Sequence, residues 1–198
     1  MKQDRSVRRA ARVGVLALAV LGVSILLLQP TAVLADGPAP DEAAANFEIK
    51  FMEDMIDHHM MAIMMAEVCL EKAIHEELVS TCENIIATQS QEMMMMQTWL
   101  QDWYGVSYEP EMNPGAMRQM EKLAELDGEE FEIAFMEEMI KHHRGAIKEG
   151  EKCLDKAYHP ELLNLCQNII ATQSQEIEMM QTWLCEWYGI CKASSPSV

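Results

Sequence analysis

Basic residues are scarce in this chain of 198 residues, which has 15 Lys and Arg against 32 Asp and Glu and a net charge of −17. A surface of that sign repels nucleic acids and anionic membranes and attracts cations. Glycine is also scarce, at 9 residues, and no Gly-rich phosphate-binding loop occurs. No hydroxyl or thiol side chain stands in an evident nucleophilic triad. These absences exclude a nucleic-acid partner, and they predict that the protein is not an enzyme.

Long apolar runs are limited to residues 13–28. Five basic residues precede this run, and Val-Leu-Ala at residues 33–35 follows it as a small-residue cleavage pattern. We therefore predict a secretory signal peptide over residues 1–35, with an uncleaved membrane anchor as the alternative. Because residues 1–35 carry a net charge of +4, the rest of the chain carries −21. We expect a periplasmic or otherwise extracytoplasmic protein that is free of the membrane after cleavage.

The rest of the sequence is a duplication. Residues 47–105 recur without a gap as residues 131–189, an offset of 84 positions. Roughly two-thirds of the paired positions are identical, far more than helical composition gives by chance. All the histidines of the chain lie inside the two copies: His58, His59, His75, His142, His143 and His159. We expect a single domain over residues 36–191, with repeats at about 47–106 and 131–190, a linker at 107–128 and a loose tail at 192–198.

Apolar residues recur with helical spacing in both copies. The pattern predicts long helices over about residues 41–73, 77–104, 129–157 and 160–188, with a short helix at about 116–126 in the linker. Gly105 and Gly189 are expected to end two of the long helices, and Pro160 fits a first helical turn. A lone helical hairpin has no core of its own. The predicted fold is therefore all-α, a four-helix bundle built from two duplicated antiparallel helical hairpins.

The cysteines agree with export. Two cysteines of the first copy recur in the second with the same spacing of 13 residues, and two more lie near the C-terminus. An oxidising compartment favours disulfides over the competing possibility of metal thiolates. The duplication then predicts one disulfide within each hairpin and, by remainder, a third one: Cys69–Cys82, Cys153–Cys166 and Cys185–Cys191.

These disulfides would also fix the register of each hairpin. In both copies the register places a histidine opposite a glutamate and a methionine opposite a methionine: His59–Glu92 and Met55–Met96, then His143–Glu176 and Met139–Met180. A carboxylate at the centre of an apolar stripe is rare unless it is paired or close to a metal. One interpretation is a buried hydrogen bond that fixes the register. The other is a metal site in which Glu92 and Glu176 orient the histidines that bind the metal.

The donor atoms beside these histidines suit copper. Thioethers bind Cu(I) and imidazoles accept either copper state, whereas Mg²⁺ and Ca²⁺ prefer oxygen. Several methionines on the face away from His59 correspond to solvent-face residues in the second copy, so we expect them to be exposed: Met60, Met61, Met64, Met65 and Met94, opposite Arg144, Gly145, Lys148, Glu149 and Glu178. An exposed methionine cluster would be a surface Cu(I) site, a contact surface for a partner, or the result of drift.

The motif Phe-Met-x-x-Met-Ile-x-His-His, followed by Gln-Ser-Gln-Glu and Met-Met-Gln-Thr-Trp-Leu, occurs in both copies. It resembles the CopM-like domain of unknown function (DUF 305) family over essentially the whole chain after residue 35. The resemblance implies an exported, ferritin-like four-helix bundle that binds copper as Cu(I) or Cu(II) and supports copper tolerance. Its partners would be copper ions and another exported copper-handling protein. The candidate ligands at matching positions are Met55, His58, His59, Met96, Met139, His142, His143 and Met180.

Two other functions remain open. A carboxylate di-iron redox protein needs Glu-x-x-His on two helices and further glutamates directed inward. Here Met55 precedes His58, and Met139 precedes His142, at the position that would require the glutamate. The third possibility is a metal-independent periplasmic chaperone or adaptor that binds partners through the methionine face.

Overall fold

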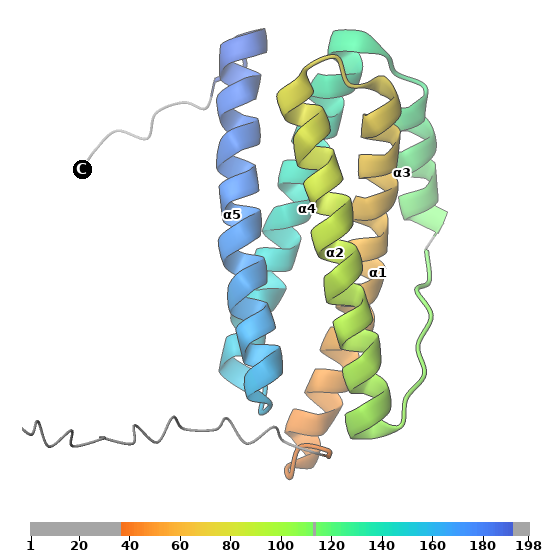
Figure 1. The fold of residues 1–198 in the computed structure, drawn as a ribbon, viewed down its shortest axis with the longest axis vertical. Helices are drawn as coiled ribbons and strands as arrows, with labels where there is room; N and C mark the ends of the chain where they lie inside the picture. Colours follow the sequence, from red (N-terminus) through yellow and green to blue (C-terminus); the bar gives the residue numbers. More distant parts are fainter. Residues whose placement is uncertain (1–36, 113, 192–198) are drawn as a thin grey trace, which may run out of the picture. The chain divides into compact units, whose positions relative to one another are not determined.

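The computed structural model describes residues 37–112 and 114–191, and these residues form helices without any β-strand. The helices are α1 (Glu42–Lys72), α2 (Glu76–Tyr104), α3 (Pro114–Ala124), α4 (Gly128–Lys156) and α5 (Pro160–Tyr188) (Figure 1). The prediction of an all-α fold is confirmed. The predicted signal peptide and C-terminal tail lie outside the described residues. Within the described part of the chain, none of the helices is long and apolar enough to cross a membrane.

The helix ends follow local sequence signals. Asp41 caps α1 by accepting a hydrogen bond from the Ala44 amide at 3.0 Å. Gly105 and Gly189 end α2 and α5 with φ of 67° and 68°, a left-handed conformation that glycine adopts without a steric penalty. Pro160 occupies the first turn of α5, where its missing N–H leaves no hydrogen bond unmade. The observed helices agree with the predicted ones to within a few residues, including the short helix in the linker.

Two antiparallel hairpins make up most of the fold. α1 packs against α2, and α4 packs against α5 (Figure 1). A disulfide with a Cα–Cα distance of 6.3 Å ties the helices of each hairpin together, and another closes the end of α5. All the predicted pairings are confirmed: Cys69–Cys82, Cys153–Cys166 and Cys185–Cys191. No described cysteine is left as a free thiol.

The hairpins meet chiefly through α1 and α4, which run antiparallel. Glu48 near the start of α1 contacts His159, which follows α4. Glu132 near the start of α4 contacts His75, which follows α1. Equivalent residues of the two copies therefore lie around an approximate two-fold axis between α1 and α4. This arrangement brings the His-His segments of both copies to the centre of the fold.

The short helix α3 packs against α1 and α4 (Figure 1). Its Met120 and Leu123 belong to the same apolar cluster as Met65 of α1, which is 1% exposed. Met65 is therefore a core residue, and the prediction that it lies on an exposed face is wrong. Its counterpart Glu149 is only half-buried. The linker helix follows only the first copy, so matching positions of α1 and α4 have different surroundings.

The other methionines predicted to be exposed are also mostly covered. Met61 and Met64 are half-buried against the apolar cluster that contains Met65, and Met60 is half-buried against the second cluster. Met94 alone among these five is exposed, at 60%. The expectation of one exposed methionine surface is therefore wrong, because α3 and the hairpin packing cover most of it.

Candidate metal centre

Each hairpin contains a buried histidine paired with a buried glutamate. His59 Nε2 lies 2.7 Å from Glu92 Oε2, and His143 Nε2 lies 2.6 Å from Glu176 Oε2. The histidines are 0% exposed, and the glutamates are 8% and 7% exposed. These are the pairs that the disulfide register predicts. An ionised carboxylate only accepts hydrogen bonds, so each Nε2 donates, and in a neutral ring Nδ1 then keeps a free lone pair.

The preceding histidines, His58 and His142, meet between α1 and α4. Their ring centroids lie 3.6 Å apart, with 35° between the ring planes. The rings come from equivalent positions of the two copies, so the approximate two-fold axis brings them together. Gly145 allows His58 its position, because a Cβ atom at residue 145 would lie 3.3 Å from His58 Nε2. The sequence identified both histidines as candidate ligands, but it gave no sign that they touch.

Several ring nitrogens in this region have no hydrogen-bond partner among the described residues. They are buried, and they belong to the histidines of both His-His pairs: His58 Nδ1, His59 Nδ1, His142 Nδ1 and Nε2, and His143 Nδ1. Each buried polar atom left unpaired costs about 1–3 kcal/mol. Groups of this kind are rare in native proteins, and they point to a bound ion or water. Imidazole nitrogen is a good donor to copper.

Burial also keeps the central pair of rings unprotonated. It lowers the pKa of His58 from 6.5 to about 3, with a further lowering from the neighbouring His59 and His143. Burial likewise lowers the pKa of His142 well below 6.5, followed by the effect of the adjacent His58. A neutral imidazole keeps the lone pair that a metal requires. His58 and His142 can therefore act as ligands at neutral and mildly acidic pH.

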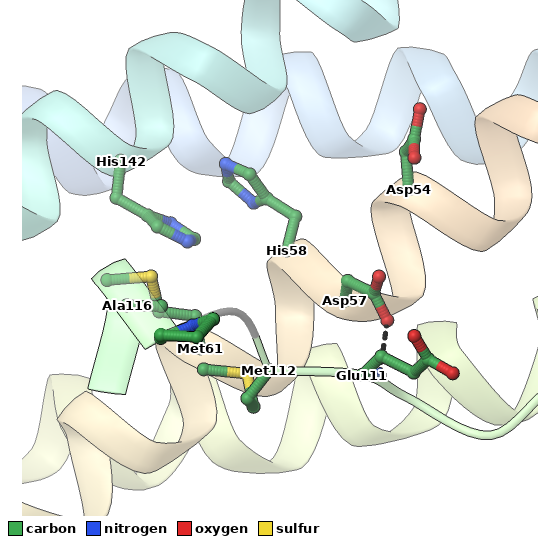
Figure 2. Close-up of a pocket in the computed structure, with 9 residues that line it drawn as sticks. Asp54, Asp57, His58, Met61, Glu111, Met112, Ala116 and His142 are labelled. Carbon is green, nitrogen blue, oxygen red and sulfur yellow. Dashed lines mark hydrogen bonds between the residues drawn. The ribbon is translucent and has the colours of Figure 1, made fainter. Parts of the chain in front are cut away.

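A cavity of about 610 Å³ opens beside these two rings. Figure 2 shows the residues that line it, which apart from Pro114 and Ala116 carry imidazole, thioether and carboxylate groups: Asp54, Asp57, His58, Met61, Glu111, Met112 and His142. The amide of Glu111 donates to Asp57 Oδ1 at 2.7 Å, which holds the linker against α1. Met112 belongs to this linker. No repeat pattern marks Met112 in the sequence, because the linker has no second copy.

The remaining candidate methionines are buried in the two apolar clusters. Met55 and Met96 lie in one cluster, and Met139 and Met180 lie in the other. Each is exposed by 2% or less. None of these four lines the cavity beside His58 and His142. Met61, which the sequence assigned to a possible surface Cu(I) site, does line this cavity.

Clusters of three or more histidine, cysteine or acidic donor side chains are absent from the described ranges. Within residues 37–112 and 114–191, no group of three or more His, Cys, Asp or Glu side chains is arranged to hold a metal ion. A carboxylate di-iron centre requires such a group. A copper site in these ranges would have to combine histidine nitrogen with thioether sulfur, a donor set that suits Cu(I).

The third histidine of the second copy belongs to a different network. His159 Nδ1 donates to Glu48, which is 0% exposed and also accepts the amides of Tyr158 and His159 at 2.6 and 2.9 Å. The Tyr104 hydroxyl donates to Glu48 as well. Trp103 stacks on the histidine ring at 3.8 Å. The other ring nitrogen of His159 lies 2.9 Å from the Gly37 carbonyl oxygen, so both ring nitrogens are engaged by groups of the protein.

An equivalent network surrounds His75 at the other end of the hairpins. His75 Nδ1 lies 2.6 Å from Glu132 Oε2, Tyr188 donates to the same carboxylate, and Trp187 stacks on the ring at 3.9 Å. Burial acts to raise the pKa of Glu132, but hydrogen bonds from Tyr188, from the amide and ring of His75 and from the Ile74 amide outweigh it and lower the pKa below its usual value. In both networks the glutamate comes from one copy and the histidine from the other. Neither His75 nor His159 was assigned a role from the sequence, although each directly precedes a long helix as its N-cap residue.

The sequence model of the family described as Domain of unknown function (DUF305) matches residues 48–184, which is more than half of the chain. The chain belongs to the DUF305 family. This confirms the CopM-like family that the His-His motif predicts. No curated protein is significantly similar to the chain.

Solved structures of the DUF305 family are similar over most of this chain. CopM in the Cu(I)-bound form is 34% identical, with a TM-score of 0.65 over 72% of this chain and 98% of that chain. CopM in the Cu(II)-bound form is 34% identical, with a TM-score of 0.65 over 71% and 97%. A DUF305 protein from Streptomyces coelicolor, described as a candidate secreted protein, is 25% identical, with a TM-score of 0.64 over 76% and 98%.

Proposed function

We propose that this DUF305 protein binds copper, as Cu(I) in particular, at a site centred on His58 and His142. The observation that carries the proposal is the contact between these two rings, whose buried nitrogens have no partner among the described residues. Met61 and Met112 line the cavity beside the rings and would supply thioether sulfur. Asp57 and Glu111 line the same cavity, and their carboxylates add negative charge that attracts a cation.

The neighbouring His–Glu pairs would support further ligands. Hydrogen bonds to Glu92 and Glu176 hold the rings of His59 and His143 with Nδ1 free. A carboxylate in this position orients a liganding imidazole and raises its basicity. We propose that each of these histidines forms a second type of site with the buried methionines of its own hairpin: Met55 and Met96 with His59, Met139 and Met180 with His143.

The family relationship supports the choice of metal. CopM structures have been solved with Cu(I), with Cu(II) and with Ag. In this proposal the four long helices form a ferritin-like four-helix bundle, with α3 added on the outside. The predicted signal peptide would export the chain, as the description of the Streptomyces coelicolor relative also suggests. Copper is then cargo that is held for tolerance and homeostasis, and the protein is not an enzyme.

The test is a competition titration of Cu(I), with Ag(I) as a redox-inert substitute, against a chelator of known affinity. We expect His58→Gln combined with His142→Gln to weaken binding at the tightest site at least tenfold, because both central ring nitrogens are lost. Met94→Leu is the matched control, since this exposed methionine lies outside the cavity. Circular dichroism would show that each variant is folded. An unchanged affinity in the folded double variant would contradict the proposal.

A further inference from the structure

A second polar site lies between α2 and α5, away from the cavity beside His58 and His142, and it shares Glu92 and Glu176 with the His–Glu pairs. A small cavity there is lined by equivalent polar residues of the two copies: Thr88, Gln89, Glu92, Thr172, Gln173 and Glu176. Its volume is about 10 Å³, enough for about one water-sized particle. The lining side chains supply only amide, carboxylate and hydroxyl groups, apart from Ile169.

Two buried glutamines with unpaired polar atoms indicate that this cavity holds a ligand. Gln89 and Gln173 are each 2% exposed and line this cavity. Gln89 Oε1 and both polar side-chain atoms of Gln173 have no hydrogen-bond partner in the described parts of the chain. Each such atom costs about 1–3 kcal/mol, whereas an apolar residue of similar shape would cost nothing. A ligand that coordinates the amide oxygens of both glutamines would remove the penalty of those two atoms.

The two glutamates determine the sign of that ligand. Glu92 and Glu176 each use Oε2 in the pair with a histidine, at 2.7 and 2.6 Å. The second oxygen of each carboxylate lies outside that pair. Buried carboxylates need compensating positive charge, and two of them line one cavity here. The ligand should therefore be a cation.

We propose that this cavity binds one hard divalent cation of the Ca²⁺ type. Its ligands would be the amide oxygens of Gln89 and Gln173 and carboxylate oxygens of Glu92 and Glu176, with the hydroxyls of the two threonines completing an all-oxygen set. Ca²⁺ takes six to eight such oxygens in flexible geometry, whereas Cu(I) prefers sulfur and nitrogen. The hairpins contact each other chiefly through α1 and α4. A cation held equally by α2 and α5 would join them on the opposite side.

Equilibrium dialysis with ⁴⁵Ca²⁺, together with thermal melts in CaCl₂, tests the proposal on the full protein. We expect one tightly bound Ca²⁺ per chain and a rise in melting temperature. Gln89→Leu combined with Gln173→Leu should abolish both effects and leave Ag(I) titrations unchanged. The matched control is Gln91→Leu with Gln175→Leu, which changes exposed glutamines two residues further along the same helices. The control should bind Ca²⁺ like the unchanged protein.

Two outcomes of the dialysis would overturn the proposal. One is the absence of stoichiometric Ca²⁺ binding, and the other is equal Ca²⁺ binding in both double variants, which would indicate weak association with surface carboxylates. If the Gln89→Leu, Gln173→Leu variant does not fold, a crystal of the unchanged protein soaked in MnCl₂ tests whether a cation occupies the cavity. An anomalous peak between Gln89 and Gln173 supports the site, and a water molecule at that position refutes it. The Ca²⁺ dialysis and the MnCl₂ soak do not depend on the copper proposal, so a failure of that proposal in the histidine variants would leave both results unchanged.

Discussion

The six histidines of the chain fall into two groups that differ in what their ring nitrogens contact. His75 and His159 each bond to a buried carboxylate at a hairpin end. The other four lie at the centre of the fold, and each of them has at least one ring nitrogen without a hydrogen-bond partner among the described residues. The same residue type therefore serves as a structural link in one place and as a candidate ligand in the other. The residues around each histidine decide which of these two roles it has.

Stability of the metal-free protein should depend on pH through the central pair. The unfolded histidines titrate near pH 6.5, whereas burial lowers the folded pKa of His58 to about 3 and that of His142 well below 6.5. The unfolded state therefore binds more protons as pH falls below about 6.5, and stability falls by up to about 1.4 kcal/mol per pH unit for each ring. Urea unfolding at pH 7, 6 and 5 measures this slope. His58→Gln with His142→Gln should flatten it, and an equal slope in the variant would contradict the account.

At the scale of secondary structure, the ends of the helices carry the links between the two hairpins. Glu48 of α1 and Glu132 of α4 are both fully buried, and each accepts hydrogen bonds from the backbone, histidine and tyrosine of the other copy or of its own hairpin. These networks hold α1 and α4 in the antiparallel register that brings His58 to His142. The candidate site therefore depends on contacts far from it.

Replacing Glu48 should show how much one network contributes. Glu48→Gln keeps the size of the side chain but puts amide hydrogens against the donors of Tyr104, Tyr158 and His159. We expect a loss of about 2–4 kcal/mol in the free energy of unfolding, as for a buried charged group that loses its partners. Urea unfolding measures it. Glu67→Gln, on the exposed face of α1, is the control and should change stability by less than about 0.5 kcal/mol.

The cover provided by α3 can be tested by exchanging residues between the copies. Met65→Glu introduces the residue that the second copy has at position 149, and it places a charge in the cluster with Met120 and Leu123. We expect a loss of at least about 3 kcal/mol in the free energy of unfolding. Met94→Glu introduces the second-copy residue Glu178 at an exposed position and should cost less than about 0.5 kcal/mol. Equal costs in urea unfolding would show that α3 does not cover α1.

At the scale of the whole molecule, the duplication decides what the sequence can predict. The long helices, the disulfide within each hairpin and the pairs His59–Glu92 and His143–Glu176 were predictable, because each signal occurs twice and a disulfide fixes its hairpin's register. The contact of His58 with His142 depends on how one hairpin packs on the other, which repeat comparison does not reveal. The same comparison wrongly predicted that Met65 is exposed, since it assumes that matching positions of the two copies have the same surroundings.

The central claim is that Cu(I) binds between His58 and His142. Nuclear magnetic resonance of the ¹⁵N-labelled histidine rings during an Ag(I) titration tests it most directly. His75 and His159 are internal controls, because their rings are held by Glu132 and Glu48. We predict that the ring nitrogens of His58 and His142 shift at the first equivalent of Ag(I), while those of His75 and His159 stay unchanged. A first equivalent that shifts His75 or His159, or that leaves His58 and His142 unmoved, would contradict the account.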